Sequence, residues 1–353
     1  MADFFIRHQQ ALHDFSEMSR SIGSRADYVQ GGGGNTSVKL EGGLMAIKAS
    51  GFHLMDVLPD AGYAVLEGAK LRDYYLNRQP SEFPDIETAG AEQAKLYTLS
   101  IERLKTLRPS VEAGFHSLLS KFVAHSHSVY GNLAACCGKA EEVTRTALEG
   151  APYSWALIPY VDPGVRLTFT IRDIIARVKR ETGRTPGILL MQNHGLIAHH
   201  DDMRACLELH EDANARFQRY FSVTPGDFPK PAVRELADGS FASNTPWLKE
   251  RLRGFKHPDA ALMDEPLYPD QMVFFQGTLG SAAVISRDSG EVRYNTPQKN
   301  AQTIEETLCA VVFIRETLRR KGLTPVSMGE AARAFISGWE SEEYRKKLAE
   351  GKG

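Results

Sequence analysis

Residues 112–128 read EAGFHSLLSKFVAHSHS, and this stretch places two histidines, His125 and His127, at the end of an apolar run. Because alternate side chains of an extended strand point to the same face, the two imidazoles are expected to emerge together, within reach of one metal ion. A third histidine, His194, ends another apolar run at an Asn-His-Gly corner. Two histidines on one strand and a third at the end of another match a catalytic zinc set that keeps an open position.

Each of these residues also has a structural interpretation. Without a third ligand, the histidine pair could be two surface imidazoles, or two imidazoles satisfied by neighbouring groups. Ser110 is well placed to cap a helix whose apolar positions recur from Phe115 onward, so Glu112 could be a first-turn acid favoured by the helix dipole. His116, on the same helix, is expected to pack or cap rather than to act. His194 favours the metal interpretation of the pair.

A glycine run precedes the first pair of expected strands. Residues 31–34 are all glycine and lead into an alternating strand from Asn35, and a second strand is predicted over 44–48. A nucleotide phosphate loop or a dinucleotide fingerprint would open a helix, so the pattern excludes both. The glycine N–H groups and the Asn35 amide could surround an anion, to which Ser50 and Gly51 could add a hydroxyl and an amide. The alternative is a flexible turn.

The bulk composition excludes several classes of protein. With 353 residues, 24% charged residues and a formal net charge of -2, the chain carries no global signal for binding nucleic acid or an anionic membrane. No apolar run approaches the roughly 18 residues of a membrane span, and the N-terminus lacks the pattern of a secretory signal. The four cysteines include no Cys-x-x-Cys pair, so we expect reduced thiols in a cytoplasmic protein.

The segments around these motifs are expected to form scaffold. A helix is predicted over 4–22, ending near Gly23. A second helix is predicted to follow a cap at Asp201, and His210 lies on its apolar stripe, which assigns that histidine to the core. The pair 199–200, both histidines, is expected to be exposed just before this helix.

Three prolines over 225–231 mark a break, after which the chain reads as an appendage. Strands are predicted over 272–275 and 282–285, followed by a long helix over 301–321 and a helical tail. Asp270 follows Pro269, and turn chemistry is a sufficient explanation for it.

In their order and spacing, these motifs resemble the class II aldolase/adducin family over about residues 20–221. The matching segments are Gly33-Gly34-Asn35-Thr36-Ser37-Val38, Ala49-Ser50-Gly51, Ser110 with Glu112, His125-Ser126-His127, Pro159-Tyr160 with Gly164, and Asn193-His194-Gly195. The glycine-rich start and the C-terminal extension look closest to rhamnulose-1-phosphate and fuculose-1-phosphate aldolase-type domains. The resemblance implies an α/β fold: a three-layer α/β/α domain around a mostly antiparallel sheet over 1–231, with a small α+β extension over 232–353. It also implies a homotetramer with sites between subunits.

The resemblance assigns roles to individual residues. It implies that His125, His127 and His194 bind Zn²⁺ or another divalent metal, and that Glu112 is the acid/base. The residues implied to contact phosphate are Asn35, Ser50, Gly51 and Ser110. Val111 departs from the pattern, because phosphate-binding members usually carry a second serine just before the glutamate. The family's proton-donating tyrosine falls in a segment without a clear match, where Tyr160 is the candidate and Tyr153 lies nearby.

The reaction implied is the reversible aldol cleavage of a ketose 1-phosphate to dihydroxyacetone phosphate and an aldehyde. Zinc would polarise the substrate oxygens, while Glu112 would shuttle the proton. Because one fold can host several reactions, epimerisation, decarboxylation or dehydration of a sugar phosphate or sugar acid remains an alternative. A non-catalytic, adducin-like binding module is a further one. The partner expected in every enzymatic case is a small sugar phosphate or sugar acid.

Overall fold

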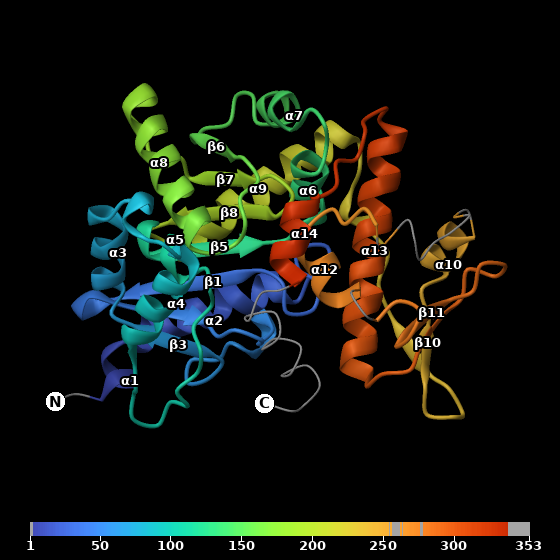
Figure 1. The fold of residues 1–353 in the computed structure, drawn as a ribbon, viewed down its shortest axis with the longest axis horizontal. Coiled ribbons are helices and arrows are strands. Elements are labelled where there is room, and N and C mark those ends of the chain that lie inside the picture. The colour runs from blue at the N-terminus through green and yellow to red at the C-terminus, as the bar shows by residue number, and fades with distance from the viewer. Residues whose placement is uncertain (1–2, 254, 256–261, 263, 276–277, 338–353) are drawn as a thin grey trace.

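An eight-stranded sheet forms the centre of the larger part of the protein (Figure 1). The structure is a computed structural model that describes residues 3–253, 255, 262, 264–275 and 278–337. The strand order is β4-β3-β2-β1-β5-β8-β7-β6, and all neighbouring pairs are antiparallel except β6 with β7. The strands are β1 Asn35–Leu40, β2 Leu44–Lys48, β3 Tyr63–Leu66, β4 Thr98–Leu99, β5 Phe122–Ser126, β6 Trp155–Ile158, β7 Ile188–Met191 and β8 Gly195–His200.

The glycine run leads into a hairpin, as the sequence predicts. Strands β1 and β2 pair with Leu40 opposite Leu44, and the short η1 turn, Glu41–Gly43, joins them. Gly42 has a φ of 76°, a left-handed conformation that glycine adopts without the steric cost of a side chain. On its other edge β1 pairs with β5, so the glycine run comes to lie beside the end of the histidine strand.

Helices cover both faces of the sheet, which confirms the three-layer α/β/α arrangement (Figure 1). One face packs against α2 (Gln9–Gly23), α6 (Val129–Ala135) and α9 (Met203–Phe221). The helix predicted over 4–22 is present as two pieces, the short α1 and then α2, which ends at Gly23. The other face carries α3 and a stack of helices that pack on one another. The remaining helices of this part are α1 Phe4–Arg7, η2 Leu54–Asp56, α3 Gly68–Asn77, η3 Pro80–Glu82, α4 Ile86–Leu96, α5 Ala113–Leu118, α7 Ala140–Ala147, α8 Val165–Thr182 and η4 Pro225–Asp227.

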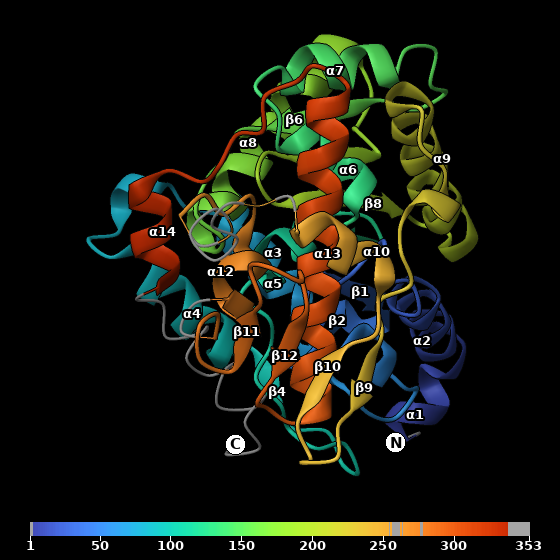
Figure 2. The same cartoon turned by 90° about the vertical axis from the view of Figure 1, so that its right-hand side faces the viewer.

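The C-terminal extension is a second, smaller α+β unit with a four-stranded antiparallel sheet of order β11-β12-β10-β9. Its long helix α13 runs between this sheet and the larger part of the molecule (Figure 1), and it stands in the middle of the face shown in Figure 2. The predicted helix over 301–321 is therefore confirmed, with bounds Gln298–Arg320. The other elements are β9 Val233–Glu235, β10 Phe241–Ser243, α10 Pro246–Leu252, α12 Pro269–Phe275, β11 Ala283–Ile285, β12 Val292–Tyr294 and α14 Glu330–Ser337.

One predicted strand of the extension is wrong, because residues 272–275 lie in helix α12. A short apolar run cannot be assigned to a strand or a buried helix by periodicity alone. Two neighbouring residues carried the helix signal: Pro269 is the first helical residue, and Asp270 is an acid in the first turn. This correction matters for function, since α12 brings Asp270 to the centre of the molecule.

The largest apolar core runs continuously from the main sheet into the extension. It includes Leu133 of α6 together with Val312 and Phe313 of α13, and the Phe313 ring lies 6.3 Å from that of Tyr130. Burial of such large apolar side chains is the main force that fixes the extension against the main sheet. The boundary between 1–231 and 232–353 stays a prediction. Within the described residues, no helix combines the length and the apolar character needed to cross a bilayer.

Candidate metal centre

Strand alternation places the histidines of β5 as the sequence predicts. His125 and His127 point to the face of the sheet that carries α5, while Ser126 between them points to the opposite face. There the Ser126 hydroxyl lies 2.7 Å from Nε2 of His210 on α9. His210 is fully buried in this contact, so its assignment to the core is confirmed.

His194 reaches the same point from the corner between β7 and β8. Asn193 adopts a left-handed φ of 50°, which turns the chain sharply and aims the next side chain back across the sheet. The Asn193 amide donates to the carbonyl oxygens of Leu267 and Val326 at 2.9 and 2.8 Å. Gly195 leaves the necessary room, because a Cβ there would lie 2.3 Å from the Ser126 carbonyl oxygen. The extension therefore helps to hold the corner that presents His194.

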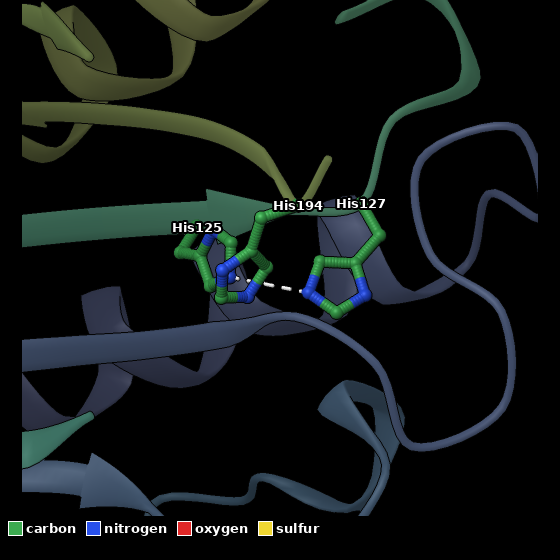
Figure 3. A group of neighbouring side chains, drawn as sticks. All are labelled: His125, His127 and His194. Atoms are coloured by element: carbon green, nitrogen blue, oxygen red, sulfur yellow. Dashed lines mark hydrogen bonds between the residues drawn. The ribbon is translucent and has the colours of Figure 1, made fainter. Parts of the chain in front are cut away.

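The three imidazoles converge in a buried cluster (Figure 3). One ligand atom from each of His125, His127 and His194 lies within 4.8 Å of the other two. The ring centroids are 4.9 to 5.2 Å apart, and each residue is at most 4% exposed. Among the histidine, cysteine, aspartate and glutamate side chains of the described residues, these three histidines form a cluster with a geometry that could hold a metal ion.

The hydrogen-bond partners of the histidines favour a cation between them. Nδ1 of His127 lies 2.5 Å from a carboxylate oxygen of Asp270, and Nδ1 of His125 lies 3.2 Å from the carbonyl oxygen of Leu196. Both partners are acceptors, so each Nδ1 carries the proton and each Nε2 keeps its lone pair. Yet the two Nε2 atoms are only 3.2 Å apart, along the dashed line in Figure 3. A hydrogen bond between them would need an additional proton, whereas a metal ion would satisfy both lone pairs.

The distances also fit zinc. With Zn–N bonds of about 2.0–2.1 Å, tetrahedral ligand atoms stand about 3.3 Å from one another. The Nε2 atoms of His125 and His127 meet this spacing at 3.2 Å, and Oε1 of Glu112 lies 3.4 Å from Nε2 of both His125 and His194. The donor set, neutral imidazoles with one adjacent carboxylate, is one that Zn²⁺ and other divalent first-row ions accept.

Glu112 faces the histidines instead of serving its helix. It occupies the N-cap position of α5, but its side chain makes no capping hydrogen bond. Its Oε2 accepts from the amide of Asn35 at 3.3 Å, and Asn35 is the register partner of His125 on the adjacent strand. Ser110 is not the cap of α5, because its hydroxyl accepts from the Glu112 N–H at 3.3 Å in the preceding turn. The turn that Ser110 stabilises therefore aims Glu112 inward.

Burial and the neighbouring histidines set the protonation of the site. Burial raises the pKa of Glu112, but the contacts of its carboxylate with His125 and His194 outweigh burial and hold that pKa well below its usual range. Burial lowers the pKa of His194 to about 4. At neutral pH the site therefore offers an ionised carboxylate and a neutral imidazole, which are the forms that bind a metal ion.

A small cavity of about 40 Å³ opens beside the histidines, and the residues expected to contact phosphate all line it. Lys48 also lines it and was not among the predicted site residues. Its ammonium group donates to the Phe52 carbonyl oxygen at 2.7 Å. Lys48 is the last residue of β2 and precedes Ser50 by two positions, and this nearness in the chain is the signal that could have indicated it. The lining residues are Gly34, Asn35, Lys48, Ser50, Gly51, Ser110, Val111, Glu112, His127, Pro163, His194, Pro269, Asp270 and Ile336.

The two tyrosines considered as proton donors do not line this cavity. The Tyr160 hydroxyl donates to Asp162 at 3.3 Å, and its ring packs on apolar residues of α12 and α14. The Tyr153 hydroxyl donates to Asp212 at 2.7 Å. Burial raises the pKa of both tyrosines. A role for Tyr160 in proton transfer stays a prediction.

The pair at 199–200 corrects another expectation. His199 is buried and not exposed, with Nδ1 2.9 Å from the hydroxyl of Ser120, whereas His200 is exposed as predicted. Strand β8 carries both residues away from the corner at His194, which agrees with the prediction. The cap of the following helix is Asp202, which accepts from Ala205 N–H, and not Asp201.

A sheet covered on both faces and a triad of histidines beside a carboxylate define an α/β protein with a candidate metal site. A profile of the family described as Class II Aldolase and Adducin N-terminal domain matches residues 13–221, and the chain belongs to this family. No curated protein matches the chain.

Several solved structures are similar to it. The N-terminal class II aldolase domain of a conserved protein from Thermoplasma acidophilum is 22% identical, with a TM-score of 0.48; the match covers 59% of this chain and 92% of that one. An L-fuculose 1-phosphate aldolase is 17% identical over 67% of this chain and 94% of that one, with a TM-score of 0.40. A sugar-phosphate aldolase from Thermotoga maritima is 12% identical over 61% and 94%, with a TM-score of 0.43.

Proposed function

We propose that the protein is a zinc-dependent lyase that cleaves a ketose 1-phosphate reversibly to dihydroxyacetone phosphate and an aldehyde. The observation that carries this proposal is the meeting of three groups in one cavity: the histidine triad, the Glu112 carboxylate, and a polar wall that includes Lys48. Family membership supports a lyase as the class of enzyme.

His125, His127 and His194 would hold the metal. The hydrogen bonds of His125 and His127 leave their Nε2 atoms for it, and Nε2 of His194 faces the same Glu112 oxygen as Nε2 of His125. The bound ion supplies a Lewis acid that polarises the carbonyl and hydroxyl oxygens of the substrate. The chain itself contributes a buried set of histidines. Asp270 fixes the second ring nitrogen of His127, and the Leu196 carbonyl fixes that of His125.

Glu112 is the residue we assign to proton transfer. Asn35 holds one of its oxygens, while the other faces the histidines, so the carboxylate is oriented toward the place where substrate would bind. Because its pKa is lowered, Glu112 is ionised at neutral pH and can accept the C3 proton of dihydroxyacetone phosphate in the direction of aldol synthesis. In the cleavage direction the protonated carboxyl would return it.

The polar wall of the cavity would bind the phosphate. Asn35, Ser50, Gly51 and Ser110 line it as the family pattern implies, and Lys48 adds a positive charge. The hydroxyl lost at Val111 is therefore offset by an ammonium group nearby. A single ammonium is a point charge that serves a phosphate or a carboxylate equally well.

This last property supports a second candidate function at the same site. Epimerisation, decarboxylation or dehydration of a sugar phosphate or sugar acid would use the same metal, base and cation. A panel of phosphorylated and unphosphorylated sugars and sugar acids separates these reactions by product. An adducin-like module without catalysis would turn over none of them.

The direct test uses isotope exchange. Zinc-loaded protein is incubated with dihydroxyacetone phosphate in D₂O, and loss of the C3 proton signal is followed by NMR. We expect exchange with wild type and a loss of about 10²- to 10⁴-fold with Glu112→Gln. Glu305→Gln is the matched control, because Glu305 is a buried carboxylate of α13 bonded to Ser243 and Tyr294 and absent from the cavity wall. Equal rates for wild type and Glu112→Gln, or no exchange at all, would contradict the assignment.

We also propose that the chain assembles as a homotetramer in the cytoplasm, as the family resemblance implies. Sedimentation equilibrium of the full chain measures the assembly. A monomer at micromolar concentration would contradict the tetramer.

A further inference from the structure

The C-terminal extension places a buried carboxylate, that of Asp270 in the first turn of α12, against the metal centre. We infer that Asp270 is a positioning residue for the ligand His127, so that the extension completes the metal centre of the main domain. This inference rests on the metal site of the proposed function and adds to it a role for the extension.

The contact between the two side chains is short and closed to solvent. Oδ2 of Asp270 lies 2.5 Å from Nδ1 of His127; Asp270 is 0% exposed and His127 is 4% exposed. A carboxylate on the second nitrogen fixes the tautomer and the ring orientation of a metal-binding histidine and makes its free nitrogen a stronger ligand. Here that free nitrogen is the Nε2 atom that faces His125.

The glycine run is fitted to this pair. A Cβ at Gly33 would lie 2.2 Å from Oδ2 of Asp270 and 2.8 Å from Nδ1 of His127, closer than real Cβ atoms approach other groups. At Gly32, one residue earlier, the nearest atom to such a Cβ is the Phe52 carbonyl oxygen at 3.8 Å. The carboxylate–imidazole contact by itself therefore requires glycine at position 33.

The segment that carries Asp270 is anchored on both sides. Its Leu267 carbonyl accepts from Asn193, the residue that aims His194. The Leu267 N–H donates to the side chain of Gln271 at 2.8 Å, and the Tyr268 hydroxyl donates to Gln30, next to the glycine run, at 3.2 Å. The extension therefore supports two of the three ligands, His127 through a side chain and His194 through a main-chain carbonyl.

A positioning role and a purely structural role make different predictions. If Asp270 only fills space in the interior, its loss lowers stability and leaves the affinity for metal unchanged. If it positions His127, its loss weakens metal binding, even at a temperature where the variant is fully folded. Metal affinity and the spectrum of a bound metal separate the two, whereas activity alone would not.

The experiment measures metal binding to the full chain after removal of metal. Zn²⁺ affinity is obtained by competition with a chromophoric chelator, and the absorption spectrum of bound Co²⁺ reports the ligand geometry. The variants are Asp270→Asn, which keeps the size and an acceptor oxygen, and Asp270→Ala, which keeps neither. Glu305→Gln is the control, because it alters an equally buried carboxylate of the extension that contacts no metal ligand.

We expect Zn²⁺ affinity to fall about 10-fold in Asp270→Asn and about 100-fold in Asp270→Ala, with an altered Co²⁺ spectrum in both. Glu305→Gln should bind both ions as wild type does. Wild-type affinity and spectrum in both Asp270 variants would overturn the inference and leave the proposed metal site intact. An equal loss of affinity in Glu305→Gln would also overturn it. A wild-type chain that binds neither ion would overturn the metal site itself, and the inference with it.

Discussion

Two groups of buried histidines lie in or next to the main sheet, and they differ in what they face. His125, His127 and His194 face one another, with a carboxylate at their edge. The second group, His116, His199 and His210, is buried to the same degree, but each of its members faces a serine hydroxyl. These partners are Ser37 at 2.8 Å, Ser120 at 2.9 Å and Ser126 at 2.7 Å.

Burial therefore does not separate a ligand from a structural histidine, but the chemistry of the partner does. A hydroxyl can donate or accept, so it satisfies the ring nitrogen that it faces in either tautomer of a neutral imidazole. Two imidazole lone pairs that face one another are both acceptors, so neither has a partner unless a cation lies between them. The predictions below test this difference between the facing triad and the serine-bonded histidines.

Removal of a ligand should have the largest effect. His125→Asn is expected to lower Zn²⁺ affinity by about 10³-fold, because one of three coordinate bonds is lost from the site. The measurement is competition with a chromophoric chelator. His199→Gln, which changes a serine-bonded histidine, should keep the wild-type affinity. If both variants lose metal equally, the division into two groups fails.

Removal of a serine-bonded histidine should act on stability. His210→Ala leaves the Ser126 hydroxyl without its partner and opens a cavity between β5 and α9, so we expect unfolding to become easier by about 3 kcal/mol. Urea denaturation measures this change, and zinc content measured at low temperature should stay at the wild-type level. A variant that unfolds like wild type but has lost its metal would reverse the assignment of His210.

Adding one methyl group at two adjacent glycines tests how tightly the triad is supported. Gly33→Ala should weaken Zn²⁺ binding by about tenfold, since its Cβ would displace Asp270 or His127. Gly32→Ala meets only an ordinary contact and should bind zinc normally. The same chelator competition compares the two variants. Equal affinities would show that the Asp270–His127 contact tolerates displacement.

The pH dependence of stability should report the serine-bonded group. Burial, with a smaller contribution from the charge of Lys39, lowers the pKa of His199 to about 4, against about 6.5 in an unfolded chain. Above about pH 6.5, His199 is neutral in both the folded and the unfolded chain, and its contribution to the free energy of unfolding is complete. As the pH falls from about 6.5 to about 4, only the unfolded state binds the proton, so stability is lost by about 1.4 kcal/mol per pH unit.

In His199→Gln the unfolding free energy should therefore fall less steeply between about pH 6.5 and 4, because unfolding takes up about one proton fewer there. Urea midpoints of wild type and variant across this range measure the difference. The same slope in both proteins would mean that His199 does not stay neutral in the folded chain.

The part of the site that the sequence predicted depends on local periodicity. Alternation put His125 and His127 on one face, and the Asn-His-Gly corner after the apolar strand β7 added His194. The hairpin of β1 and β2 followed from its glycines in the same way. Lys48 is the last residue of the apolar strand β2, two positions before Ser50, so its nearness in the chain to the Ser50–Gly51 turn is a signal that the glycine run does not contain.

The support of the site could not be predicted in this way. Asp270 is 143 residues from His127 in the chain, and turn chemistry explained it locally. The segment that follows Asp270 was taken for a strand, although its proline and acid favour a helix start. The position of His199 just before the expected helix cap at Asp201 predicts exposure, but β8 extends to His200 and buries His199 against Ser120. In each case a partner distant in the sequence decided the outcome.

The central claim is that the triad of His125, His127 and His194 holds a divalent metal. The most direct measurement is the metal content per chain, by inductively coupled plasma mass spectrometry, after purification without chelator and again after exposure to zinc and desalting. The account predicts about one zinc or other divalent ion per wild-type chain and much less in His125→Asn. A wild-type chain with no divalent ion after either treatment would contradict it.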